Sequence, residues 1–108
     1  MEGLELICFQ IISAVGTSRS NYIEAIQLAK QGDFDGAKKS IEEGEKNYII
    51  GHQAHAKLVQ QEAAGKKIEL KLLLLHAEDL QMSAETFGIL ANEFVDVYKQ
   101  MNQLKKSN

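Results

Sequence analysis

The sequence contains no proline, and this absence favours long uninterrupted helices, because proline removes a backbone donor and breaks a helix interior. The single cysteine, Cys8, cannot form a disulfide within the chain and has no second cysteine for a thiolate metal site. We therefore expect a buried structural thiol in a reducing, cytoplasmic compartment. No apolar run approaches the roughly 18 residues of a membrane-spanning helix.

Clustered basic residues are also missing. The formal net charge is -3, and the lysines are scattered among glutamates, so we expect neither nucleic acid nor an anionic membrane as a direct partner. The apolar run near the N-terminus is preceded by acidic rather than basic residues, so we expect no signal peptide. Phosphate-loop, dinucleotide and HExxH signatures are absent from the sequence, which argues against the enzyme classes that depend on them.

Helical periodicity dominates what is present, and strand-like alternation is missing. Gly32 and Gly65 follow apolar-periodic segments as helix C-terminal glycines do, and Asp33 is placed as the N-cap of the next helix. We predict an all-α fold in which residues 1–108 form one domain. Its helices span about 4–31, 33–64 and 67–105, and very short turns make it an antiparallel, up-down-up three-helix bundle.

The third predicted helix has two apolar stripes. A heptad seam marks the face that packs on the other helices: Leu73, Ala77, Leu80, Ala84, Phe87, Ala91, Phe94, Tyr98 and Met101. At about 100° per residue, a second group lies around Asp79: Ile68, Leu72, Leu75, Met82, Thr86, Leu90 and Val97. A helix in a three-helix monomer needs only one stripe, so we expect the second to be covered by copies of the chain in a symmetric oligomer.

Asp79 lies in the middle of this second stripe. Carboxylates that meet on an oligomer axis must be neutralised by protons or by a shared cation, and a hard divalent ion such as magnesium suits oxygen ligands. The alternative is that Asp79 reaches the rim and pairs with a lysine or with Ser83.

His76 precedes Asp79 by three residues, so the two side chains are neighbours on the helix surface. An imidazole there can act as nucleophile, base or metal ligand, or it can be a satisfied core residue without chemistry. His52 and His55 have the same spacing, but no third ligand is evident. For these two histidines, solvated or interhelical hydrogen-bonding roles are favoured over metal binding.

These residues resemble a known family, the lactose/cellobiose-type IIA components of the bacterial phosphoenolpyruvate-dependent sugar phosphotransferase system. The most specific segment is LLLLHAEDLQM, Leu72 to Met82, which is similar to the family's LLLVHAQDHLM. Three further segments extend the resemblance over nearly the whole chain: Phe9 to Ile26, Gly32 to Gly44 and Leu58 to Glu69.

The resemblance implies a homotrimer of three-helix units in which His76 carries the phosphoryl group. It implies that Asp79 of three subunits shares a divalent cation, with Mg²⁺ as the expected ion. The implied donor is the histidine-containing phosphocarrier protein, and the implied acceptor is a cysteine of a IIB component. The membrane would be involved only indirectly, through the sugar permease component, and the sugar would be a disaccharide of the lactose, cellobiose or chitobiose class.

The chain also departs from the family pattern. Glu78 and His55 replace glutamines, and Leu80-Gln81 replaces a His-Leu pair. The group that orients His76 is left open between Asp79, a backbone carbonyl and a glutamine of a neighbouring chain. One alternative function is a helical interaction module like a tetratricopeptide pair, although no second copy follows at 34 residues. Another is a scaffold trimer in which Asp79 only fixes the register.

Overall fold

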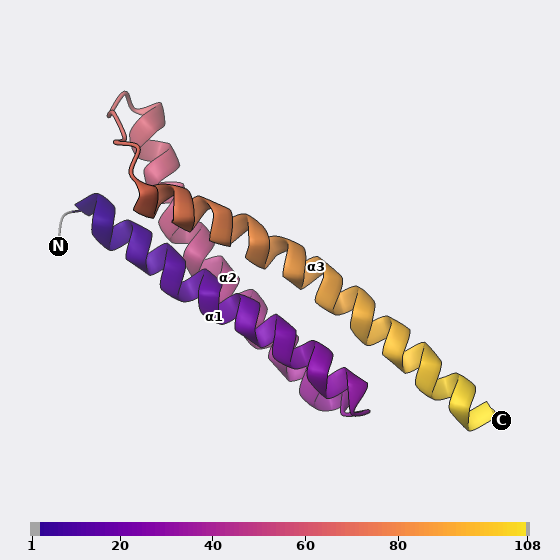
Figure 1. The fold of residues 1–108 in the computed structure, drawn as a ribbon. Helices are drawn as coiled ribbons and strands as arrows, with labels where there is room; N and C mark the ends of the chain where they lie inside the picture. The colour runs from indigo at the N-terminus through magenta and orange to yellow at the C-terminus, as the bar shows by residue number, and fades with distance from the viewer. Residues whose placement is uncertain (1–2, 108) are drawn as a thin grey trace.

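The computed structural model describes residues 3–107 as three helices, with no strand among them. They are α1 (Gly3–Lys30), α2 (Phe34–Ala63) and α3 (Leu72–Ser107). Met1, Glu2 and Asn108, which the predicted domain includes, lie outside the described residues. The helices form an elongated bundle with extents of 62 × 22 × 19 Å, and α3 extends past the turn between α1 and α2 (Figure 1).

The turn between α1 and α2 is confirmed in detail. Gly32 has a φ of 85°, a left-handed conformation that glycine adopts without steric cost. Asp33 caps α2, since its Oδ1 accepts a hydrogen bond of 2.9 Å from the backbone N–H of Gly36. A turn this short places α2 antiparallel to α1.

The predicted start of the third helix is wrong. We expected it near Lys67 after a very short turn, but residues 64–71 form an irregular link and α3 begins at Leu72. Ile68 packs against the core from this link, and Lys71 Nζ lies 3.6 Å from Glu5 Oε1. These tertiary contacts hold the segment away from helical geometry, and the sequence there offers no Ser, Thr, Asn or Asp to cap an earlier start.

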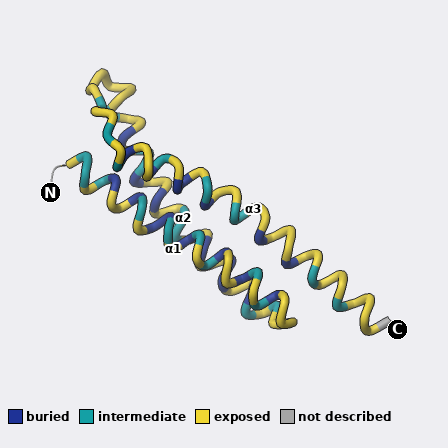
Figure 2. Tube along the Cα trace, in the orientation of Figure 1, coloured by how far each residue is buried: buried dark blue, intermediate teal, exposed yellow. Residues whose placement is uncertain are grey.

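Two clusters of buried side chains form the core. One joins the first half of α1 to the start of α3, and the other lies around the turn between α1 and α2. Alanine is frequent in both clusters, which lets the helix backbones approach closely. Figure 2 shows these buried positions on the inward sides of the helices, while much of the surface of α3 is exposed.

The residues of the predicted heptad seam are buried or partly buried in the first half of α3, but not all of them are in its second half. Phe94 and Met101 are about half exposed, whereas Val95 is buried in their place. A strict heptad repeats every 3.5 residues and a straight helix every 3.6, so the buried position moves around the helix as the seam lengthens.

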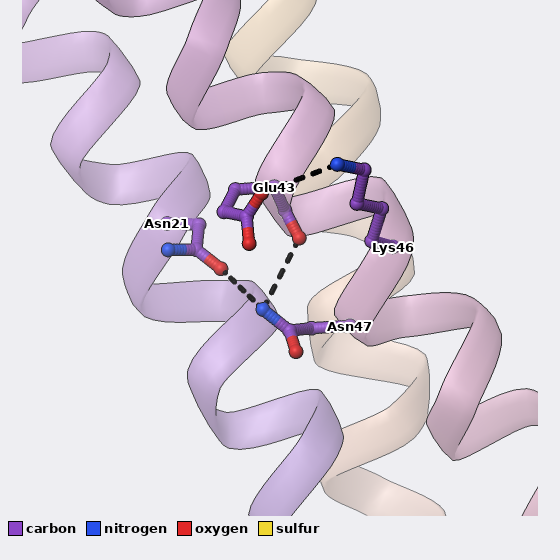
Figure 3. Close-up of polar contacts among 4 residues, drawn as sticks. All are labelled: Asn21, Glu43, Lys46 and Asn47. Atoms are coloured by element: carbon purple, nitrogen blue, oxygen red, sulfur yellow. Dashed lines mark hydrogen bonds and ion pairs between the residues drawn. The ribbon is translucent and has the colours of Figure 1, made fainter.

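Polar contacts join the middle of α1 to α2. Asn47 Nδ2 donates to Asn21 Oδ1 across the helix pair, at 2.9 Å, and to the carbonyl of Glu43, at 3.1 Å (Figure 3). Close by, the buried hydroxyl of Ser18 donates to the carbonyl of Gly44 at 2.6 Å. Because buried polar groups are costly when unpaired, these bonds fix the register of the two helices.

Gly44 allows α2 to pack closely against Tyr22 of α1. A Cβ at Gly44 would stand 2.6 Å from Cε1 of Tyr22, whereas one at Gly16 would meet only Leu80 Cδ2, at an ordinary 3.8 Å. We expect Gly44→Ala to destabilise the fold by about 1–3 kcal/mol through overpacking. Gly16→Ala should be neutral or slightly stabilising, because alanine favours the helix. Equal urea midpoints for the two variants would contradict this packing account.

We expect the buried Cys8 thiol to make the fold sensitive to alkali. Burial, helped by the nearby Glu78 carboxylate, raises the pKa of Cys8 above its ordinary value. The native state then keeps a proton that the unfolded chain loses above about pH 8.5, so the free energy of unfolding falls as the pH rises past that point. We expect urea unfolding of Cys8→Ala to show a weaker decline between about pH 8 and pH 10 than wild type. Equal declines in the free energy of unfolding for wild type and Cys8→Ala would contradict this prediction.

Candidate functional site

His76 lies near the start of α3, on the side that borders α1. Its own side chain is exposed, while Leu80, one turn further along the same side, is buried and faces Gly16 of α1. The reading of His76 as a satisfied core residue is therefore wrong for this chain. No hydrogen bond or ion pair engages its ring among residues 3–107, and the residue as a whole is exposed to solvent.

Asp79 lies on the outer face of α3 and is also exposed. No hydrogen bond links it to His76 or to Ser83 in the described part of the chain; the Ser83 hydroxyl is instead 3.4 Å from Arg19 Nη1. Asp79 therefore does not orient the His76 ring within one chain, and the pairing of Asp79 with Ser83 is not formed.

The second apolar stripe is present around Asp79, and neither α1 nor α2 covers it. Leu72 is 83% exposed and Met82 is 60% exposed, which is far more than a monomer core would leave open. Ile68 is the exception among the predicted members, because it lies in the link. The exposed apolar side chains of this face, which we call the outer stripe, are Leu72, Leu75, Met82, Ile89, Leu90, Val97 and Leu104.

The described residues of a single chain do not bring together the ligands of a metal site. Within residues 3–107, no three His, Cys, Asp or Glu side chains lie close enough together to hold an ion. Asp79 supplies one hard oxygen donor group of the type that magnesium accepts, so further carboxylates would have to come from other copies of the chain.

A short contact between α2 and α3 was not predicted from the sequence. His55 Nε2 and Glu78 Oε1 lie 2.6 Å apart, and both side chains are partly buried. The two residues that the resemblance gave as departures from glutamine thus contact each other, which confirms the interhelical role expected for His55. His52 stacks on Tyr48 with a ring-centroid distance of 6.1 Å. Pairing the two departures across antiparallel α2 and α3 could have predicted the first contact.

Arg19 is a second feature that the sequence reasoning missed. Its guanidinium lies over the Phe87 ring, 5.8 Å from the centroid, and near the Ser83 hydroxyl. Because Ser83 and Phe87 follow His76 by seven and eleven residues, the three lie on the same side of α3. A fixed positive charge therefore lies about two turns from His76, along the border between α1 and α3.

None of the described helices is long and apolar enough to cross a membrane.

Comparisons with known proteins agree over nearly the whole chain. Residues 6–99 match a family described as "PTS system, Lactose/Cellobiose specific IIA subunit". The lichenan-specific phosphotransferase enzyme IIA component of Bacillus subtilis is 37% identical over 102 residues, which cover 94% of this chain and 93% of that protein. The lactose-specific EIIA component of Staphylococcus epidermidis is 30% identical over 97 residues, covering 90% and 93% of the two chains.

Solved structures also resemble this fold. The crystal structure of the PTS cellobiose-specific enzyme IIA from Bacillus anthracis superposes with a TM-score of 0.93 at 39% sequence identity. The superposition covers 95% of this chain and 94% of that one. Fold and sequence therefore point to the same group of proteins.

Proposed function

Because the chain belongs to the lactose/cellobiose-specific IIA family of the sugar phosphotransferase system, we propose that it carries a phosphoryl group on His76. The observation that carries this proposal is the position of His76, which is exposed beside buried Leu80 with no partner on its ring among the described residues. A histidine held only by structural contacts would be paired or buried, whereas a carrier residue must be reached by other proteins.

The proposed reaction has two transfers. In the first, the lone pair of a neutral His76 ring nitrogen attacks the phosphorus of the phosphohistidine on the histidine-containing phosphocarrier protein. The new P–N bond forms as the donor's P–N bond breaks, the electron pair returns to the donor imidazole, and that imidazole takes up a proton as the His76 ring loses one. In the second, a cysteine thiolate of the IIB component attacks the phosphorus, and the His76 nitrogen regains its electron pair. Such transfers ask the protein mainly for positioning and charge stabilisation.

The surroundings of His76 suit two partners that dock in turn. The His76 imidazole is exposed, and partly buried Leu73 lies three residues before it, on the side of α1. A small exposed surface of this kind supports weak, transient encounters, which a carrier needs because it must release each partner quickly.

The outer stripe supports the proposal of a homotrimer. Around a threefold axis, three copies of α3 would bury their outer stripes against each other and bring three Asp79 carboxylates together. A divalent cation, with Mg²⁺ as the expected ion, would neutralise the carboxylates at the axis. This cation would have a structural role in the assembly, and His76 would carry the chemistry alone.

The sugar is proposed to be a disaccharide or related β-glycoside of the lactose, cellobiose or chitobiose class. The similar proteins are named for lichenan, oligo-β-mannoside and lactose. These names differ at comparable identity, so overall similarity supports the class of sugar rather than one member.

A labelling experiment tests the proposed function. The protein is incubated with radiolabelled phosphoenolpyruvate, the general first enzyme of the system and the histidine-containing phosphocarrier protein. We expect an acid-labile, base-stable label, as phosphohistidine gives. A chain that takes no label under conditions that phosphorylate the carrier would contradict the proposal and favour a scaffold trimer.

A further inference from the structure

We infer that Glu78, through its hydrogen bond to His55, is a positioning residue that sets the orientation of His76. This inference deepens the proposed function and rests on it. It starts from the 2.6 Å contact between Glu78 Oε1 and His55 Nε2, which joins α3 to α2. Bonds between a carboxylate and an imidazole N–H are charge-assisted and stronger than bonds between neutral groups.

Partial burial adds to the strength of this contact. The His55 side chain is 20% exposed and that of Glu78 is 41% exposed. Both lie at a recess between α2, the link and α3, which Leu58, Ile68 and Leu74 also line. Because Leu58 and Leu74 are buried, the carboxylate meets an apolar surround on its inner side, where a lost partner is costly.

The position of Glu78 on α3 connects this contact to His76. The two residues are two positions apart, so at about 100° per residue they project from nearly opposite sides of the helix. Rotation of the start of α3 about its own axis would therefore move the imidazole along the border with α1. A bond from Glu78 to α2 resists this rotation, in addition to the buried side chains of Leu74, Ala77 and Leu80.

Few other polar contacts hold this end of α3. No acidic residue lies in its first turn, Lys71 pairs with Glu5 and Glu69 just before the helix begins, and further along α3 Glu85 Oε2 accepts a hydrogen bond of 3.5 Å from Tyr48 of α2. Overall, α3 packs less extensively on α2 than on α1. The bond from Glu78 to His55 is thus a main polar link between α2 and the turn that carries His76.

Misplacement of a reacting group by about 1 Å can cost on the order of 10²-fold in rate. For Glu78→Ala and for His55→Ala, we expect the maximal rate of His76 phosphorylation to fall by roughly 10- to 100-fold, with little change in KM for the carrier protein. Glu78→Gln keeps an Oε1 that can accept from His55, so it should restore most of the rate. Glu93→Ala is the matched control, because it removes an exposed carboxylate of the same helix without a described partner.

A second readout needs no phosphoryl donor. In proton–nitrogen spectra, the ring signals of His76 should shift in Glu78→Ala and return towards wild type in Glu78→Gln, with Glu93→Ala unchanged. Unshifted signals in Glu78→Ala, or a rate equal to that of Glu93→Ala, would overturn the inference. A Glu78→Gln as impaired as Glu78→Ala would overturn it too. Failure of the proposed function is distinguishable, because wild type would then take no label while the spectra still report the ring.

Discussion

His76→Ala is expected to fold as wild type does and to accept no phosphoryl group. The substitution removes the proposed nucleophile, and no neighbouring ring can replace it: His52 and His55 project from α2 and are engaged with Tyr48 and Glu78. We expect the initial rate of labelling to fall by more than about 10³-fold. Because the side chain is exposed, the free energy of unfolding should change by no more than about 0.5 kcal/mol.

Labelling rates and urea unfolding check this prediction on the same preparations. His52→Ala is the matched control, since it removes an exposed imidazole from the same end of the bundle and should leave the rate within about twofold. A His76→Ala variant that still takes label at the wild-type rate would show that another residue carries the phosphoryl group. A variant that loses both label and fold would require His76→Gln in its place.

The second large effect concerns Asp79 and assembly. In the proposed trimer, three Asp79 carboxylates meet at the axis, and each pair at about 4 Å repels by roughly 4 kcal/mol at an effective dielectric of 20. We expect magnesium to stabilise the wild-type trimer and a chelator to weaken it. Asp79→Leu should give a trimer that forms without metal and resists the chelator, because an apolar side chain then continues the outer stripe.

Sedimentation equilibrium with and without chelator tests this prediction. Asp96→Leu is a suitable control, because Asp96 is an exposed aspartate of the same helix, whose carboxylate accepts a hydrogen bond from Gln100 at 2.9 Å. It should retain the wild-type response to chelator. Wild-type protein that remains monomeric at micromolar protein concentration in the presence of magnesium would contradict the trimer. An Asp79→Leu trimer that dissociates when chelator is added would contradict the proposed role of the carboxylate.

Local signals in the sequence were enough to predict α1 and α2. Gly32 and Asp33 determine the first turn through left-handed backbone geometry and capping, which depend on the nearest residues alone. The start of α3 could not be predicted in this way, because Ile68 and Lys71 hold the link through contacts with distant parts of the chain. Phe94 was misplaced because the strict heptad drifts around a helix of 3.6 residues per turn, so Val95 is buried in its place.

The candidate site, like the fold, could be predicted from the sequence only in part. His76 and Asp79 were found from a motif and from their place on one helix, and their exposure agrees with a surface that other chains reach. The contact between Glu78 and His55 joins residues of different helices, so it depends on the relative register of α2 and α3. That register is set by the packing of Gly44 of α2 and Gly88 of α3 around Tyr22, which periodicity does not encode.

The most direct test of the central claim is to identify the labelled residue in the wild-type chain. The protein is phosphorylated through the carrier, digested at alkaline pH to preserve phosphohistidine, and the labelled peptide is sequenced by mass spectrometry. We predict one phosphoryl group, on His76, which a IIB component with an intact cysteine removes. A phosphoryl group on His52 or His55, or none on any histidine, would contradict the account.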